Sequence, residues 1–99
     1  MPTDYVAISN FSQTNNVLTV AEAMLTEGNY NRVRYVGVSD TSSYIQGGPS
    51  AYSTYMVTQH LDTITVFTIR YGGGEIYTNG RSRDGSWVGW KKTTMTNVF

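Results

Sequence analysis

The stretch that decides the fold spans residues 73–92 and has the sequence Gly73-Gly74-Glu75-Ile76-Tyr77-Thr78-Asn79-Gly80-Arg81-Ser82-Arg83-Asp84-Gly85-Ser86-Trp87-Val88-Gly89-Trp90-Lys91-Lys92. It contains both tryptophans of the chain and four of its seven basic residues. Asp84-Gly85 lies between two extended runs and predicts a hairpin, because the tight turn needs a positive φ that Gly supplies without steric cost. On a regular strand Trp87 and Trp90 would point to opposite faces. We therefore expect one in the core and the other exposed or at an interface.

Alternating segments upstream of this hairpin predict the sheet on which it packs. They span residues 30–38, 51–61, 64–71 and 75–79, and short turns between them favour antiparallel pairing of neighbours. Their large aromatic residues are expected to fill most of the core, together with the tryptophans: Tyr35, Tyr55 and Phe67.

A single helix is predicted over residues 17–27, because Val17, Ala21, Met24 and Leu25 share one helical face. Thr19 and Glu22 have the spacing of a capping box, and Gly28 is expected to end the helix. The predicted fold class is therefore mainly β, α+β: a single small antiparallel sheet or sandwich with one short N-terminal helix. Residues 17–99 form the domain, and residues 1–16 are expected to be a linker or an N-terminal strand.

The composition excludes several classes of function. The 99 residues carry no net charge and no cysteine, which argues against binding to nucleic acid and against thiolate chemistry. No segment is apolar enough for a membrane span, and Met1-Pro2-Thr3-Asp4 lacks the features of a signal peptide, although the chain is compatible with being part of a longer one. His60 is the lone histidine and the acidic residues form no evident pair, so we expect no enzyme activity, no metal and no cofactor.

The end of the chain resembles the knob-like domains at the tips of bacteriophage tail fibres and contractile pyocin fibres. The resemblance is carried by Ile76-Tyr77, by Arg81, by Gly85-Ser86-Trp87-Val88-Gly89-Trp90 with Lys91, and by Gly28-Asn29-Tyr30 upstream. Asn79 stands where similar domains have an arginine. The resemblance implies a homotrimeric fibre-tip domain, located on the virion tail fibre, that attaches to the host cell.

Eight tyrosines and two tryptophans, together with abundant Asn, Thr and Ser, suit sugars, whose C–H faces lie on aromatic rings while their hydroxyls need hydrogen-bond partners. We therefore predict a receptor-binding domain for a bacterial surface polysaccharide. The alternative is a structural trimerisation cap that touches no receptor. The loop at residues 40–52 and the turn of the hairpin are rival contact sites, and the candidate ligand-binding residues are Tyr44, Tyr52, Tyr77, Asn79, Arg81, Arg83, Asp84 and Trp87.

Overall fold

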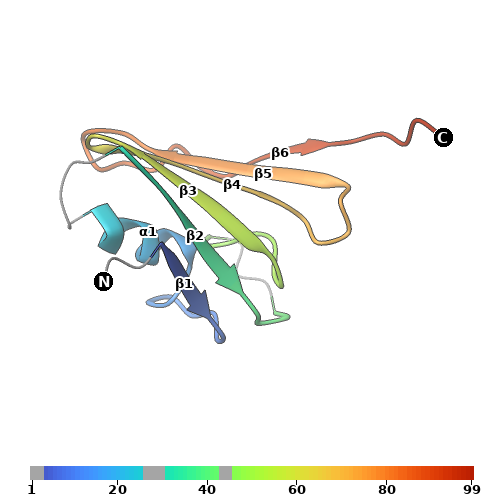
Figure 1. The fold of residues 1–99 in the computed structure, drawn as a ribbon, viewed down its shortest axis with the longest axis horizontal. Coiled ribbons are helices and arrows are strands. Elements are labelled where there is room, and N and C mark those ends of the chain that lie inside the picture. Colours follow the sequence, from blue (N-terminus) through green and yellow to red (C-terminus); the bar gives the residue numbers. More distant parts are fainter. Residues whose placement is uncertain (1–3, 26–30, 43–45) are drawn as a thin grey trace.

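The computed structural model describes residues 4–25, 31–42 and 46–99 and shows a six-stranded sheet with one helix (Figure 1). The strands lie in the sheet in the order of the sequence, β1 to β6. The elements along the chain are β1 (Tyr5–Ile8), α1 (Val17–Leu25), β2 (Arg32–Val38), β3 (Thr54–His60), β4 (Thr63–Ile69), β5 (Glu75–Arg81) and β6 (Lys91–Thr94).

The predicted fold class, a strand-rich α+β domain with one short helix, is confirmed. Strands β2 to β6 pair antiparallel with their neighbours in sequence. The exception is β1, which pairs parallel with β2 over Tyr5–Ile8, so that α1 lies in the crossover between the two strands. A parallel pair needs such a crossover because no tight turn can join its ends.

Helix α1 begins at Val17 as predicted, but its N-cap lies three residues before the predicted Thr19. The Asn16 side chain accepts a hydrogen bond from the Thr19 amide, and the Thr19 hydroxyl accepts one from the Asn16 amide, both at 3.0 Å. Asn16 is therefore the N-cap, and the predicted Thr19–Glu22 capping box is wrong. Val17, Ala21 and Met24 are buried as the spacing predicted, whereas Gly28 lies outside the described residues. No helix in the described part of the chain is long and apolar enough to cross a membrane.

The core lies between α1 and one face of the sheet, which we call the helix-side face. Its buried apolar residues come from β1 to β4 and from the helix: Ile8, Val17, Ala21, Met24, Val36, Val38, Tyr55, Val57, Ile64 and Val66. Arg34 is buried on the same face and donates to the carbonyl of Met24 at the end of α1, at 3.2 Å. Tyr55 is in the core as predicted. Tyr35 is not, because it lies on the opposite face and is 43% exposed, and Phe67 on that face is half-buried.

The hairpin after β5 forms at Asp84-Gly85 as predicted, but its second strand is not regular. Thr78 pairs with Lys91, and Arg81 pairs with Trp87, so three steps along β5 match four steps along its partner. The extra residue is a β-bulge, which bends a strand and changes the direction of its side chains. Gly89 has a φ of 106° there, a conformation that glycine adopts most readily.

The bulge turns both tryptophans toward the helix-side face. Trp87 and Trp90 are each partly buried against the core, so the prediction that they point to opposite faces is wrong. Asn79 holds the irregular segment, because its side-chain oxygen accepts from the amide of Gly80 at 2.8 Å and from that of Gly89 at 3.0 Å.

Candidate functional site

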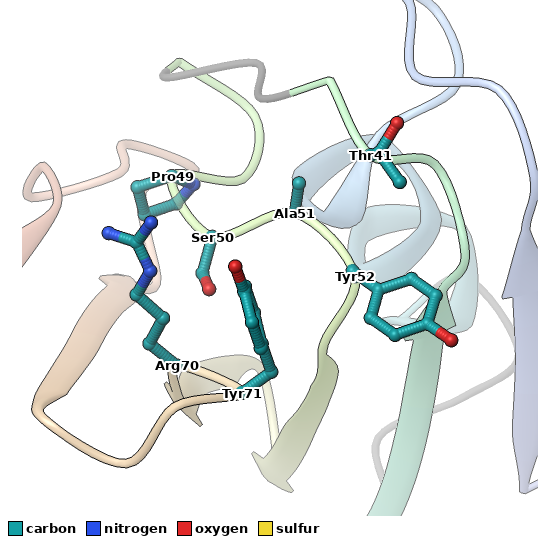
Figure 2. A pocket seen from close by; sticks show the side chains of 7 residues that line it. All are labelled: Thr41, Pro49, Ser50, Ala51, Tyr52, Arg70 and Tyr71. Carbon is teal, nitrogen blue, oxygen red and sulfur yellow. The ribbon is translucent and has the colours of Figure 1, made fainter.

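A pocket of about 360 Å³ lies where the loop before β3 meets the loop after β4 (Figure 2). Antiparallel pairing of these two strands places both loops at the same end of the sheet. Hydroxyls, two tyrosines and one cation share the lining, which consists of Thr41, Pro49, Ser50, Ala51, Tyr52, Arg70 and Tyr71. The volume lies in the range of about 300–1,000 Å³ that small-ligand sites occupy.

Two exposed tyrosines form the aromatic part of this pocket. The rings of Tyr52 and Tyr71 meet edge to face, with their centroids 6.2 Å apart and their planes at 88°. They are 59% and 69% exposed, although large aromatic residues are usually covered. Tyr52 has a φ of 50°, a left-handed conformation that costs a residue other than glycine about 1–2 kcal/mol. Strained backbone of this kind is concentrated at functional sites.

Tyr55, in the core, holds the loop that forms one wall of the pocket. Its hydroxyl donates to the carbonyl of Ser50 at 2.6 Å and accepts from the Ser50 amide at 2.8 Å. Burial raises the pKa of Tyr55 far above its usual value, so the hydroxyl keeps the proton that it donates. Trp90 packs against the Tyr55 ring and donates from its indole nitrogen to the carbonyl of Gln46 at 3.0 Å. The loop is therefore fixed from beneath before any ligand arrives.

Asp40 fixes the opposite wall, next to Thr41. One carboxylate oxygen accepts from the Phe11 amide at 2.8 Å, and the other accepts from the amide and hydroxyl of Ser42 at 2.8 and 2.7 Å. The Asp40 carbonyl also accepts from the Tyr52 amide at 3.0 Å. The hydrogen bonds from Ser42 and Phe11 lower the pKa of the Asp40 carboxyl, which therefore stays ionised. Both of its oxygens already accept hydrogen bonds from these two residues.

Arg70 supplies the charge at the rim. Its guanidinium lies 5.8 Å from the centre of the Tyr71 ring and donates to Glu75 at 3.2 Å. Glu75 also accepts from the Tyr77 hydroxyl at 2.8 Å and pairs with Lys92 at 3.5 Å. Hydrogen bonds from Tyr77 and Arg70 lower the pKa of Glu75, and the bond to Glu75 raises that of Arg70. Because Glu75 largely neutralises the charge of Arg70, the rim of the pocket offers hydrogen-bond donors without a strong positive potential.

Two of the predicted ligand-binding residues, Trp87 and Arg81, form hydrogen bonds to the helix. Glu22 accepts from the Arg81 guanidinium at 3.2 Å and from the Trp87 indole nitrogen at 3.1 Å, through the same carboxylate oxygen. We call these three residues the Glu22 cluster. It joins α1 to the last hairpin across the helix-side face, which is a structural role.

The other predicted residues of the hairpin turn are also engaged locally. Asp84 accepts from the hydroxyl of Ser82 and from the amide of Ser86, and these bonds, with that from the Ser86 hydroxyl, lower its pKa to about 2. Arg83 pairs with Asp62 at 3.1 Å and is otherwise largely exposed. This turn lies at the far end of β5 from the pocket, about 20 Å away for a strand of seven residues.

Of the predicted site residues, Tyr52 lines the pocket and Tyr77 lies just behind it through its bond to Glu75. Asn79 is buried in the bulge, and Tyr44 lies outside the described residues. The prediction missed Tyr71, although an aromatic residue directly before Gly72-Gly73-Gly74 must lie at a strand end. Strand topology would have placed it beside the loop before β3.

The pocket lining includes hydroxyls, aromatic rings and a paired arginine, but none of the described lining residues is a carboxylate or a histidine. The part of the chain that the structure describes contains no group of three His, Cys, Asp or Glu side chains placed to hold a metal ion. The arrangement suits binding of a hydroxyl-rich ligand. Comparison of the chain with protein-family models, curated proteins and solved structures gave no match.

Proposed function

We propose that the protein is a receptor-binding, host-adhesion domain of a phage tail fibre or a related particle, and that it binds a bacterial surface glycan as a homotrimer. The observation that carries the glycan part is the pocket with two exposed, edge-to-face tyrosines, Tyr52 and Tyr71, beside Ser50 and Arg70. Trimeric state and fibre-tip location rest on the resemblance of residues 76–91 to fibre knobs.

Each part of the pocket matches a need of a saccharide. The apolar face of a sugar ring can lie against a tyrosine, while Thr41 and Arg70 offer hydrogen-bond partners for its hydroxyls. The site is also preformed, because Tyr55 and Asp40 hold its two walls. Preorganisation reduces the ordering cost of binding. A shallow site of this size binds weakly by itself, and several copies on one fibre would raise the affinity through effective concentration.

The test is binding of the labelled protein to bacterial cells, with purified surface polysaccharide as the competitor. Tyr71→Ala removes half of the aromatic pair, and we expect it to reduce cell binding at least tenfold while the fold is retained. Tyr52→Asn is a second variant, chosen because Asn tolerates the left-handed backbone of that position.

The matched control is Val88→Ala, which is 64% exposed at the far end of the sheet and should bind cells like the wild type. Cell binding that survives both tyrosine substitutions, or that polysaccharide does not compete, would contradict the proposal.

A second candidate function is a structural cap that holds three fibre chains together. It is favoured by the apolar face of the sheet that α1 does not cover, where Val33, Tyr35 and Ile69 are all exposed. A cap would assemble normally and bind no cells, with or without Tyr71.

A further inference from the structure

The sheet has one face that the described chain leaves open, and we propose that a second copy of this chain packs on it. This inference rests on the multimeric part of the proposed function and is independent of the glycan pocket. We call this surface the open face. It lies opposite α1, which Figure 1 shows on one side of the twisted sheet. Its large apolar members on β1 to β5 are Tyr5, Val33, Tyr35, Met56, Phe67, Ile69 and Ile76.

The register shows that these side chains share one face. Tyr5 pairs with Tyr35, Tyr35 with Met56, and Met56 with Phe67, so the four form a continuous row across β1 to β4. Side chains of directly paired residues lie on the same side of a sheet. Tyr5 and Tyr35 are 53% and 43% exposed at one end of this row, and a hollow of about 340 Å³ lies over Tyr35, Met56 and Phe67.

The charge distribution favours a copy of the same chain as the occupant. By alternation, Arg32, Arg34, Glu75 and Arg81 point to the helix-side face, and the described open face carries Thr side chains around its apolar row. Lys91 on β6 is its charged member, at the edge of the sheet. Two such faces can therefore meet without bringing like charges together. Apolar contacts between two sheets are the usual way in which a sandwich core forms, with the sheets about 10 Å apart.

The size of the face is also close to what a stable contact needs. Four strands of seven residues, β2 to β5, cover roughly 450 Å² in projection, or about 900 Å² for two copies. Tyr5 extends this surface over β1, and specific interfaces begin near 1,000 Å² in total. Association through the β6 edge is disfavoured, because Lys91 and Lys92 lie on that strand and lysines block edge-to-edge pairing.

Gly37 of β2 leaves room for the Tyr5 ring on the open face. A Cβ at this position would overlap the Tyr5 side chain, so the ring crosses the β2 backbone where no side chain stands. Aromatic residues packed over strand glycines are a known device that stabilises sheets. Here the device keeps an apolar ring on the surface that the proposal assigns to the second copy.

The first test measures the mass of the wild-type protein and of a variant by light scattering. The wild type should have a mass of two or three times 11.0 kDa at micromolar concentration, and Tyr35→Glu should return it to 11.0 kDa. The matched control is Val98→Glu, an apolar position in the segment after β6 that is 90% exposed, which should keep the wild-type mass. A monomeric wild type, or a Tyr35→Glu variant that is folded and keeps its mass, would overturn the inference.

A second test covers the case in which Tyr35→Glu does not fold. The chain has no cysteine, so Val33→Cys introduces a single thiol on the open face, at a position that is 49% exposed in one copy. We expect this thiol to react at least tenfold more slowly with a thiol reagent at high protein concentration than after dilution. Val98→Cys, in the exposed segment after β6, should show no such difference. Equal rates for Val33→Cys at both concentrations would refute the interface. A monomer that still binds glycan would contradict this inference and the homotrimeric part of the proposed function, but not the glycan pocket. An oligomer that binds no glycan would contradict only the receptor proposal.

Discussion

Replacing Tyr55 by Phe removes one oxygen atom from the core and leaves the shape of the side chain unchanged. The lost hydroxyl bonds both the amide and the carbonyl of Ser50, at 2.8 and 2.6 Å. Ser50 is 3% exposed, so water cannot easily replace the missing partner. Tyr55→Phe therefore tests how firmly the core holds the wall of the pocket.

The expected loss of stability follows from these contacts. Two buried hydrogen bonds contribute about 1 kcal/mol each, and a buried peptide group left without a partner costs about 1–3 kcal/mol. Partial relaxation of the loop at residues 46–53 lowers the sum, so we expect the free energy of unfolding to fall by about 2–4 kcal/mol. That is a large part of the roughly 5–15 kcal/mol typical of a domain, and it corresponds to a decrease in Tm of roughly 10–25 °C.

Urea unfolding followed by tryptophan fluorescence measures this change, because Trp90 packs against Tyr55 with centroids 5.8 Å apart. Both proteins are compared at one concentration, since association would add to stability. Tyr35→Phe is the control, because its ring lies on the open face, and it should change the free energy by no more than about 0.5 kcal/mol. A Tyr55→Phe variant that loses less than about 0.5 kcal/mol would refute the view that this hydroxyl holds the loop.

Three further predictions concern the last hairpin. In a double-mutant cycle of Glu22→Gln and Trp87→Phe, the coupling energy should be about 0.5–1 kcal/mol by urea unfolding, reduced by the partial exposure of the carboxylate; additive losses would mean that the contact contributes nothing. Gly89→Ala should lower the free energy of unfolding by roughly 1–3 kcal/mol. The cause is its φ of 106° alone, since a Cβ there meets no atom within 4 Å. Gly72→Ala is the control, because that position is equally open but has no positive φ, and it should be close to neutral. The pKa of Asp84 is lowered from 3.8 to about 2 in the fold, so its contribution to the turn should be complete above about pH 4 and lost as the pH falls toward 2; a carboxyl that titrates near 4 by NMR would contradict the hydrogen bonds of the turn.

Local patterns were enough to predict β2 to β5, the helix and the turn at Asp84-Gly85, because each depends on side-chain alternation or on one residue pair. They were not enough for features that depend on partners far along the chain. Thr19-x-x-Glu22 is a good capping sequence, but the N-cap is Asn16, three residues earlier. The Glu22 side chain binds Arg81 and Trp87 instead of the helix N-terminus. The alternation in β2 also places apolar residues on both faces, so it could not show which face α1 covers.

Only part of the candidate site could be predicted, because the rest depends on contacts between residues far apart in the sequence. Tyr52 was identified from its loop, whereas Tyr71 was assigned to a strand and overlooked, since the contact between them depends on how β3 and β4 pair. The predicted directions of the tryptophans were wrong because of the extra residue in the bulge around Gly89. It moves the side chains that follow it to the other face of the sheet. A periodicity of two cannot reveal such an insertion until the pairing of the strands is known.

The Glu22 cluster has a consequence for the order in which the chain folds. Glu22 and Trp87 are 65 positions apart, and β1 pairs with a strand that begins 24 residues after it ends, whereas the hairpins of β3, β4 and β5 close over short turns. Contacts between distant residues form slowly, because the intervening chain must first lose its freedom. We expect the central hairpins to form first and α1 to dock last, after the segment around Trp87 has been synthesised. Pulse-labelled hydrogen exchange should then show protection in β3 and β4 before protection in α1.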